Sequence, residues 1–190
     1  MAACGSVACM FEAYYKRYYG RMAIGTTLVS EQEYLSTNYK PACDYIDGVL
    51  RPKPMATSDH GTIQSSLSIA IARQSPQFVP GSEISVRLRP GKYFVPDLIV
   101  QLRDRYQRPY PTEPVHLCVE IMSPEDRFAE TVAKCAEYHA WGVETTWIID
   151  PESRQAWEYR KSHQPREVPP GGTLTAEGIS VSLTEIFANL

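Results

Sequence analysis

Two short apolar segments, each interrupted by a single carboxylate, constrain this chain more than any other feature. Residues 94–102 and 115–122 are rich in Val, Ile and Leu, and they contain Asp97 and Glu120. Segments of this length and composition predict buried strands. A carboxylate inside a buried strand is costly unless a partner compensates its charge. Both acids therefore require a partner in the folded protein.

The spacing of the two segments predicts that their carboxylates face each other. If residues 103–114 form the connection and the strands pair antiparallel, Leu102 lies opposite Val115. Asp97 then lies directly opposite Glu120, with Cβ atoms about 5 Å apart, and like charges at that separation repel. A divalent cation held between the two acids would turn the repulsion into binding. On this basis, replacing Asp97 by Asn in the metal-free protein is expected to be neutral or stabilising.

A helix is predicted directly after the second segment. Ser123 has the character of an N-cap, and Pro124 suits the first helical position. Asp126 stands three residues after Ser123, within reach of a capping box. The helix is expected to run to Trp141 and to end at Gly142.

Lys134 lies at the edge of the apolar stripe of this helix. The stripe consists of Phe128, Val132, Cys135 and Tyr138 or His139. A lysine at that edge can bury its aliphatic stem and direct its ammonium towards the sheet. The alternative is a surface ion pair with Glu130 in the favoured i, i+4 order. Considered together with Asp97 and Glu120, the interior position is favoured, which makes Lys134 the third group of a candidate site.

The remaining elements alternate between helices and strands. Asp47-Gly48 is a strong signal for the turn of a hairpin over residues 45–53. A helix over 57–73 places His60 in its first turn, where a histidine is more often a capping or surface residue than a ligand. The other predicted elements are a helix over 30–36 and strands over 83–89, 144–149 and 156–160. This order predicts an α/β sandwich whose mixed β-sheet is flanked by α-helices.

The length of the chain suits one domain with a sizeable core, since it has 190 residues. We assign this domain to residues 22–190 and interpret residues 1–21 as a poorly ordered extension. Residues 2–11 are small and apolar, but no basic segment precedes them, which argues against a signal peptide. The sequence contains no apolar run long enough to span a membrane.

The five cysteines form no CxxC pair and no cluster with histidine. This pattern argues against a zinc site. It favours a reduced, cytoplasmic setting in which the cysteines pack as small apolar groups.

The net charge of −3 is unusual for a nucleic-acid-binding protein, because neutralisation of phosphates supplies much of the affinity. Any electropositive surface must therefore be local. The best candidate is the connection between the two apolar segments, where Arg103, Arg105 and Arg108 alternate with tyrosines that could stack on bases. A solvated surface loop explains the same residues equally well. Arg51 and Lys53 form a second, weaker basic patch.

Several short motifs, taken in order, resemble a known family. They are Pro96-Asp97, residues 119–124, Lys134, Tyr138, Gly142-Val143 and residues 147–151. Their order and spacing are similar to those of a bacterial restriction-endonuclease family of the "Uma-two" type, within the PD-(D/E)XK nuclease superfamily. The likeness begins near Met22 and runs to the C-terminus.

The resemblance implies a restriction-endonuclease-like sandwich and a metal-dependent active site. Asp97, Glu120 and the backbone carbonyl of Ile121 would hold Mg²⁺ or Mn²⁺. The superfamily commonly has its catalytic lysine two residues after the second acid, where this chain has Met122. In this branch the lysine lies on the following helix, and Lys134 falls at that place. The residues that the resemblance adds to the lining of the site are Asp44, His60 and Glu130.

The implied activity is endonucleolytic hydrolysis of phosphodiester bonds in nucleic acid, with DNA as the expected substrate. One alternative is a catalytically silent protein of the same fold that acts as a nucleic-acid or protein binding module. A second is an ordinary α/β domain whose acids are paired with lysine or arginine. The sequence leaves open the recognition sequence and the oligomeric state, for which a homodimer is one option.

Overall fold

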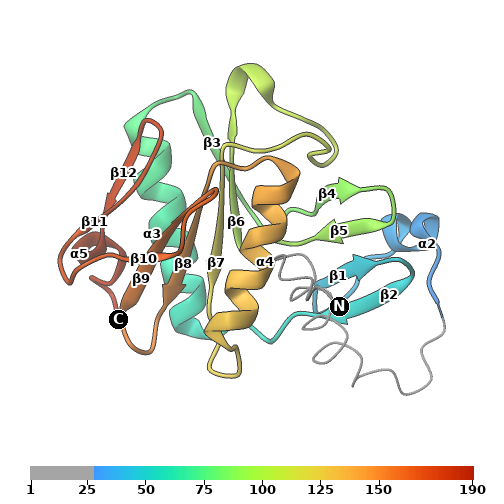
Figure 1. The fold of residues 1–190 in the computed structure, drawn as a ribbon, viewed down its shortest axis with the longest axis horizontal. Coiled ribbons are helices and arrows are strands. Elements are labelled where there is room, and N and C mark those ends of the chain that lie inside the picture. The colour runs from blue at the N-terminus through green and yellow to red at the C-terminus, as the bar shows by residue number, and fades with distance from the viewer. Residues whose placement is uncertain (1–27) are drawn as a thin grey trace, which may run out of the picture.

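The computed structural model describes residues 28–190 (Figure 1), so the extension predicted for residues 1–21 lies outside the described part. The helices are α2 (Glu31–Ser36), α3 (Ser58–Gln74), α4 (Phe128–Trp141) and α5 (Leu183–Ile186), with a 3-10 turn at Arg103–Arg105. The strands are β1 (Cys43–Ile46), β2 (Val49–Pro52), β3 (Phe78–Ser82), β4 (Val86–Arg89), β5 (Lys92–Phe94), β6 (Leu98–Leu102), β7 (Leu117–Ile121), β8 (Thr145–Asp150), β9 (Gln155–Arg160), β10 (Arg166–Glu167), β11 (Thr173–Ala176) and β12 (Ile179–Ser182).

A six-stranded mixed sheet forms the centre of the fold. Its order is β10-β9-β8-β7-β6-β3, and β7 and β8 are its parallel pair. A four-stranded sheet, β2-β1-β5-β4, lies beside it, and β11 and β12 form a separate hairpin. Helix α3 packs on β3 and β12, whereas α4 packs on β7 and β8 (Figure 1). The α/β sandwich with a mixed sheet, predicted from the order of elements, is confirmed.

Alternate residues of the central strands face the two helices, as the period of a β-strand requires. One core cluster joins Leu67 of α3 to Val119 of β7. The other joins Cys135 of α4 to Cys118 of β7. Since Glu120 has the same parity as Cys118, its side chain leaves the sheet on the α4 side.

The register of β6 against β7 is the one that the sequence predicts. The ladder pairs Leu98 with Val119, and Ile99 with Cys118. One further step along the ladder places Asp97 opposite Glu120. The two buried acids of the central strands therefore meet at one end of the β6–β7 pair.

The sequence predicted one strand over residues 94–102, but the structure divides this apolar segment between two strands. Its first part belongs to β5 of the small sheet and its last part to β6 of the central sheet. The break falls at Val95-Pro96-Asp97, where proline has no N–H to donate to a ladder. Asp97 therefore lies where the chain crosses between the two sheets. This crossing brings the β1–β2 hairpin next to the carboxylates.

Helix α4 begins at Phe128, whereas the sequence predicted Ser123 as its N-cap and Pro124 as its first residue. The N–H of Ser123 does donate to Asp126 Oδ2, at 2.7 Å, as in a capping box. Arg127 then adopts an extended conformation, with φ −105° and ψ 127°, so the chain leaves this turn before the helix starts. Phe128 is accordingly 36% exposed and packs against Trp157 instead of entering the core. The predicted end is confirmed, because Trp141 is the last helical residue and Gly142 has φ 128°.

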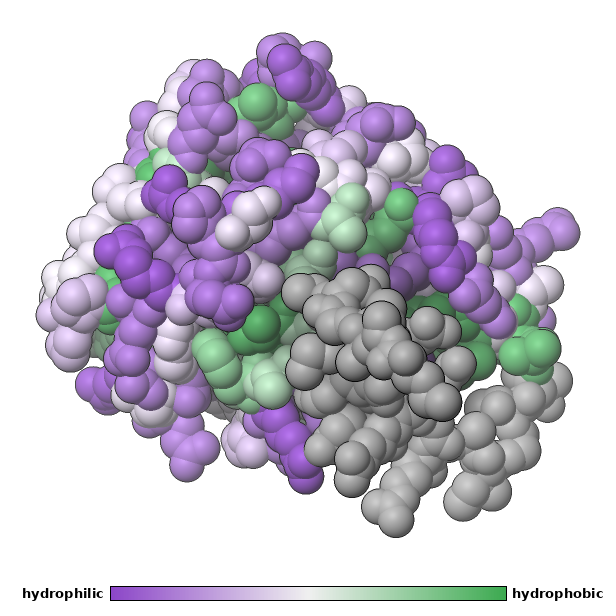
Figure 2. Space-filling model, viewed as in Figure 1, coloured by the Kyte–Doolittle hydropathy of each residue, from purple (hydrophilic) through white to green (hydrophobic). Residues whose placement is uncertain are grey.

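The other predicted elements are present. Ser30 caps α2, and Asp47 and Gly48 form the hairpin turn with positive φ. Helix α3 begins after Thr57, and β8 pairs with β9 antiparallel. The face of the molecule in Figure 2 is mostly hydrophilic. Among the described helices, none has the length and apolar character needed to cross a membrane.

Candidate active site

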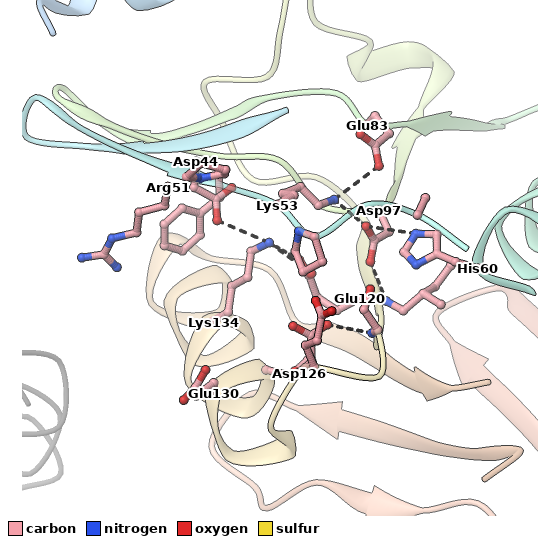
Figure 3. Close-up of a pocket in the computed structure, with 18 of the residues that line it drawn as sticks. Asp44, Arg51, Lys53, His60, Glu83, Asp97, Glu120, Asp126, Glu130 and Lys134 are labelled. Atoms are coloured by element: carbon pink, nitrogen blue, oxygen red, sulfur yellow. Dashed lines mark hydrogen bonds and ion pairs between the residues drawn. The ribbon is translucent and has the colours of Figure 1, made fainter. Parts of the chain in front are cut away.

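A cavity of about 380 Å³ lies where the central sheet, the small sheet and the first turns of α3 and α4 meet (Figure 3). Its lining includes every residue that the sequence analysis placed in the site: Asp44, His60, Asp97, Glu120, Ile121, Glu130 and Lys134. These residues come from five separate parts of the chain. The fold thus gathers them around one space.

Asp97 is a buried, ionised carboxylate. It is 2% exposed, and its Oδ2 accepts a hydrogen bond from the N–H of Ile121 at 2.6 Å. Its Oδ1 lies 2.5 Å from Nζ of Lys53. Burial alone would raise the pKa of Asp97, but the contact with His60 and the ammonium of Lys53 outweigh it and hold the pKa well below its usual range.

Glu120 is a second buried acid in a different electrostatic state. Tyr138 donates its hydroxyl hydrogen to Oε1 at 2.6 Å, and Lys134 donates to Oε2 at 3.1 Å. Burial raises the pKa of Glu120 to about 7; the ammonium of Lys134 opposes this rise and the charge of Asp97 adds to it. Near neutral pH, a cation that binds Glu120 must therefore displace a proton from part of the population.

Lys134 enters the site from α4. Besides Glu120, its ammonium lies 3.5 Å from Asp44 Oδ2 and 3.5 Å from the carbonyl oxygen of Val95. Burial would lower the pKa of Lys134, but Asp44 and Glu120 outweigh it and raise the pKa above its usual range. Within the described residues, the ion pairs of Lys134 are with Asp44 and Glu120 and not with Glu130. The side chain thus takes the interior position that the sequence favoured over a surface pair.

Lys53 also lines the cavity, although the sequence analysis assigned it only to a weak basic patch. Its ammonium donates to Asp97 Oδ1, to the carbonyl oxygen of Val95 at 3.0 Å and to Glu83 Oε1 at 3.4 Å. Burial would lower the pKa of Lys53, but the carboxylate of Asp97 outweighs it and raises the pKa. One signal in the sequence could have indicated a second lysine. Asp97 and Glu120 were both expected to be buried, but Lys134 alone was assigned to them, so one negative charge had no partner.

His60 is buried in the first turn of α3, and its ring points at Asp97. The residue is 5% exposed, with Nε2 3.4 Å from Asp97 Oδ1. Within the described part, neither ring nitrogen has a hydrogen-bond partner. A buried polar atom without a partner is destabilising and therefore needs an explanation. His60, Glu83 and Asp97 each offer one ligand atom, and these atoms lie within 4.8 Å of one another.

The donor set fits a divalent cation. Carboxylate oxygens are the ligands that Mg²⁺ and Mn²⁺ prefer, and an imidazole nitrogen is better suited to Mn²⁺ than to Mg²⁺. The structural observation that supports this fit is the ring of His60: its nitrogens have no hydrogen-bond partner among the described residues, and Nε2 lies 3.4 Å from Asp97 Oδ1. Ile121 also lines the cavity, directly after Glu120 in β7.

The arginines proposed for nucleic-acid contact lie at the other end of the strand pair. Asp97 precedes β6, whereas Arg103 and Arg105 follow it, and a five-residue strand spans about 16 Å. Arg103 donates to the carbonyl oxygen of Pro76, and the guanidinium of Arg108 lies 5.2 Å from the ring centre of Tyr106. The structure thus does not bring these three arginines to the carboxylates.

The mixed α/β sandwich, which has buried acids and lysines at its centre, is a nuclease-like fold. The chain belongs to the family described as "Uma2: Putative restriction endonuclease", whose model matches residues 30–187. A crystal structure described as "a putative nuclease belonging to DUF820", from Anabaena variabilis, is similar, with a TM-score of 0.72. The match covers 84% of this chain and 98% of that chain at 20% sequence identity, a level at which the likeness shows the fold. A comparison with curated proteins found no match.

Proposed function

We propose that this protein is a metal-dependent endonuclease that hydrolyses phosphodiester bonds, with DNA as the favoured substrate. The observation that carries the proposal is the pair of buried acids, Asp97 and Glu120, opposed on neighbouring strands with Lys134 held against Glu120. Membership of the family supports nuclease chemistry at this pair. The different pKa values of the two acids also support nuclease chemistry: Asp97 is ionised, whereas the pKa of Glu120 is about 7.

The residues have distinct proposed roles. Asp97, Glu120 and the carbonyl oxygen of Ile121 would hold Mg²⁺ or Mn²⁺, with His60 as a further ligand. A bound metal supplies a more acidic water molecule and neutralises charge on the phosphate. Lys134 would orient the attacking water or stabilise the negative charge that develops in the transition state.

Other contacts position these groups. Asp44 accepts from the N–H of Val95 at 2.7 Å and also faces Lys134, so it fixes the ammonium relative to the sheet crossing. The hydroxyl of Tyr138 orients Glu120. Glu130 lines the outer part of the same cavity and is proposed to add only to its overall negative charge.

A second candidate is a silent nuclease-fold protein that binds nucleic acid or a protein partner. The observation in its favour is that Asp97 pairs with Lys53, and Glu120 with Lys134. In this reading the four charges form structural ion pairs, and no metal is needed. Metal uptake followed by cleavage favours the nuclease, whereas protein that takes up no metal, or that takes it up without cleaving, favours the second candidate.

The wider surroundings are part of the proposal. We assign Arg103, Arg105 and Arg108 to a distant segment of a long nucleic acid, since they lie far from the carboxylates.

Three free cysteines, Cys43, Cys118 and Cys135, are buried. They support the cytoplasm as the compartment, because its reducing conditions keep thiols free.

Titration calorimetry with Mn²⁺ tests the metal site. We expect uptake by the parent protein and no measurable uptake by Asp97→Ala, because the variant loses a central ligand. Asp104→Ala is the matched control, since it removes an exposed acid from the 3-10 turn. Parent protein that binds Mn²⁺ should then cleave at least one of single-stranded DNA, double-stranded DNA and RNA. Metal uptake unchanged in Asp97→Ala would refute the site, and bound metal without any cleavage would favour the silent protein.

The affinity for Mn²⁺ should rise as pH increases through about 7. Burial raises the pKa of Glu120 to about 7, so protons compete with the metal below this value and not above it. Calorimetry at about pH 6 and about pH 8 should show the difference as tighter binding at the higher pH, with proton release at the lower. Glu120→Gln should bind weakly and lose this step. The same affinity of the parent at both pH values would contradict the assignment of Glu120 as a ligand.

A further inference from the structure

The ammonium of Lys53 is surrounded by oxygen acceptors, as a bound metal ion would be (Figure 3). Its acceptors are Asp97 Oδ1 at 2.5 Å, the carbonyl oxygen of Val95 at 3.0 Å and Glu83 Oε1 at 3.4 Å. An ammonium has three N–H donors, and three acceptors are present. The side chain is only 13% exposed, so these contacts are shielded from water.

The same carboxylates belong to the candidate metal position. One carboxylate oxygen each of Asp97 and Glu83 and one ring nitrogen of His60 lie within 4.8 Å of one another. Oδ1 of Asp97, which accepts from Lys53, also lies 3.4 Å from His60 Nε2. Two cations a few ångströms apart in a shielded site repel each other strongly. A metal ion that takes Asp97 Oδ1 must therefore displace the ammonium of Lys53.

The backbone of Lys53 is anchored by a hydrogen bond, whereas its side chain can turn. Its N–H donates to the carbonyl oxygen of Ala42 at 2.8 Å, which continues the β1–β2 ladder by one residue. The four-carbon stem above it has rotatable bonds. Lys53 and Lys134 line one cavity, and both ammoniums already approach the carbonyl oxygen of Val95. An ammonium that leaves Asp97 thus remains in the cavity that would receive the phosphate.

We propose that Lys53 is a second cationic group of the site, which neutralises Asp97 before metal binds and contacts the substrate phosphate afterwards. The inference rests on the proposed nuclease function. It explains how a carboxylate as buried as Asp97 is tolerated before a metal arrives. It also gives the site two ammoniums in the reacting complex: Lys134 beside Glu120 and Lys53 beside the phosphate.

Calorimetry with Mn²⁺ on Lys53→Met provides the first test. We expect binding about tenfold tighter than in the parent, because no ammonium has to be displaced from Asp97. Cleavage at saturating Mn²⁺ should nevertheless fall by about 10²-fold, because a group that stabilises the phosphate is lost. Lys53→Arg keeps the charge and should bind Mn²⁺ like the parent. Lys161→Met is the control: it removes an exposed lysine that pairs with Glu144 and should change neither quantity.

Opposite changes in affinity and rate distinguish this role from a structural one. If Lys53 merely holds Asp97 in place, Lys53→Met should bind Mn²⁺ as weakly as the parent or more weakly, and either result overturns the inference. A parent protein that takes up no Mn²⁺ overturns the proposed function as well. Metal uptake by the parent without tighter binding by Lys53→Met overturns only the role of Lys53.

A measurement on the parent protein covers the case in which Lys53→Met does not fold. Acylation of amines, followed by mass spectrometry, should modify Lys53 slowly in the metal-free protein. Addition of Mn²⁺ should increase its modification severalfold, while that of Lys161 stays constant. Unchanged modification of Lys53 in protein that calorimetry shows to be loaded with Mn²⁺ would overturn the displacement.

Discussion

Lys134→Ala is expected to lose most hydrolysis, by about 10²–10³ in single-turnover rate, because one preorganised charge is removed from the transition state. Its affinity for Mn²⁺ should stay within a few-fold of the parent. Removing the ammonium of Lys134 strengthens Mn²⁺ binding, because a nearby positive charge is lost. It also raises the proton affinity of Glu120, which weakens Mn²⁺ binding near neutral pH, so the two effects on metal affinity oppose each other. The Mn²⁺ affinity of Lys53→Met is not offset in this way, because Asp97 stays ionised and no proton competes with the metal there.

Two further variants make the result on Lys134 decisive. Lys134→Arg should rescue poorly, since a planar guanidinium does not reproduce a compact ammonium. Glu130→Gln should retain its metal affinity and most of its activity if the partners of Lys134 are Glu120 and Asp44, as in the structure. Full activity of Lys134→Ala, measured beside a Mn²⁺ titration, would show that the catalytic assignment is wrong.

Asp97→Asn should destabilise the metal-free protein by about 3–5 kcal/mol, the usual cost of removing one member of a buried ion pair. This reverses the expectation from the sequence, which considered the repulsion from Glu120 alone. The structure adds the ammonium of Lys53 and the N–H of Ile121, both of which hold the charged form of Asp97. Urea unfolding in the presence of a chelator measures the effect.

The control for the unfolding experiment is Asp104→Asn, which changes an exposed acid and should be neutral to within about 0.5 kcal/mol. Added Mn²⁺ should raise the melting temperature of the parent and of this control, because a ligand that binds the folded state stabilises it. Asp97→Asn should gain nothing from Mn²⁺. A variant Asp97→Asn that is as stable as the parent without metal would mean that the contact with Lys53 contributes little.

Local patterns in the sequence were sufficient for much of the fold and for the face of the site that lies on the central sheet. The two apolar segments determine a register through their period of two, and that register places Asp97 opposite Glu120. The hairpin at Asp47-Gly48 and the helix after Thr57 follow from turn and capping chemistry. Each of these predictions depends on neighbours within one or two elements.

Features that depend on packing between distant elements could not be predicted in this way. Pro96 indicates a break in the ladder of hydrogen bonds, but nothing in the local sequence indicates that β5 and β6 belong to different sheets. The contact of Lys53 with Asp97 joins residues 44 positions apart, and it exists only because of that break. The late start of α4 was not predicted either: the capping contact between Ser123 and Asp126 forms, but the backbone of Arg127 is extended and the helix begins after it.

The crossing at Val95–Asp97 divides the candidate active site between two sheets. Asp44 and Lys53 belong to the β1–β2 hairpin of the small sheet, whereas Glu120 is anchored in the central sheet. The small sheet has its own tyrosine-rich cluster, around Tyr45 and Tyr93. Partial unfolding of that cluster would move Lys53, which the small sheet holds, away from Lys134, which α4 holds against the central sheet. Inactivation should therefore precede global unfolding, so residual activity after mild heating reports on the small sheet and not on the fold as a whole.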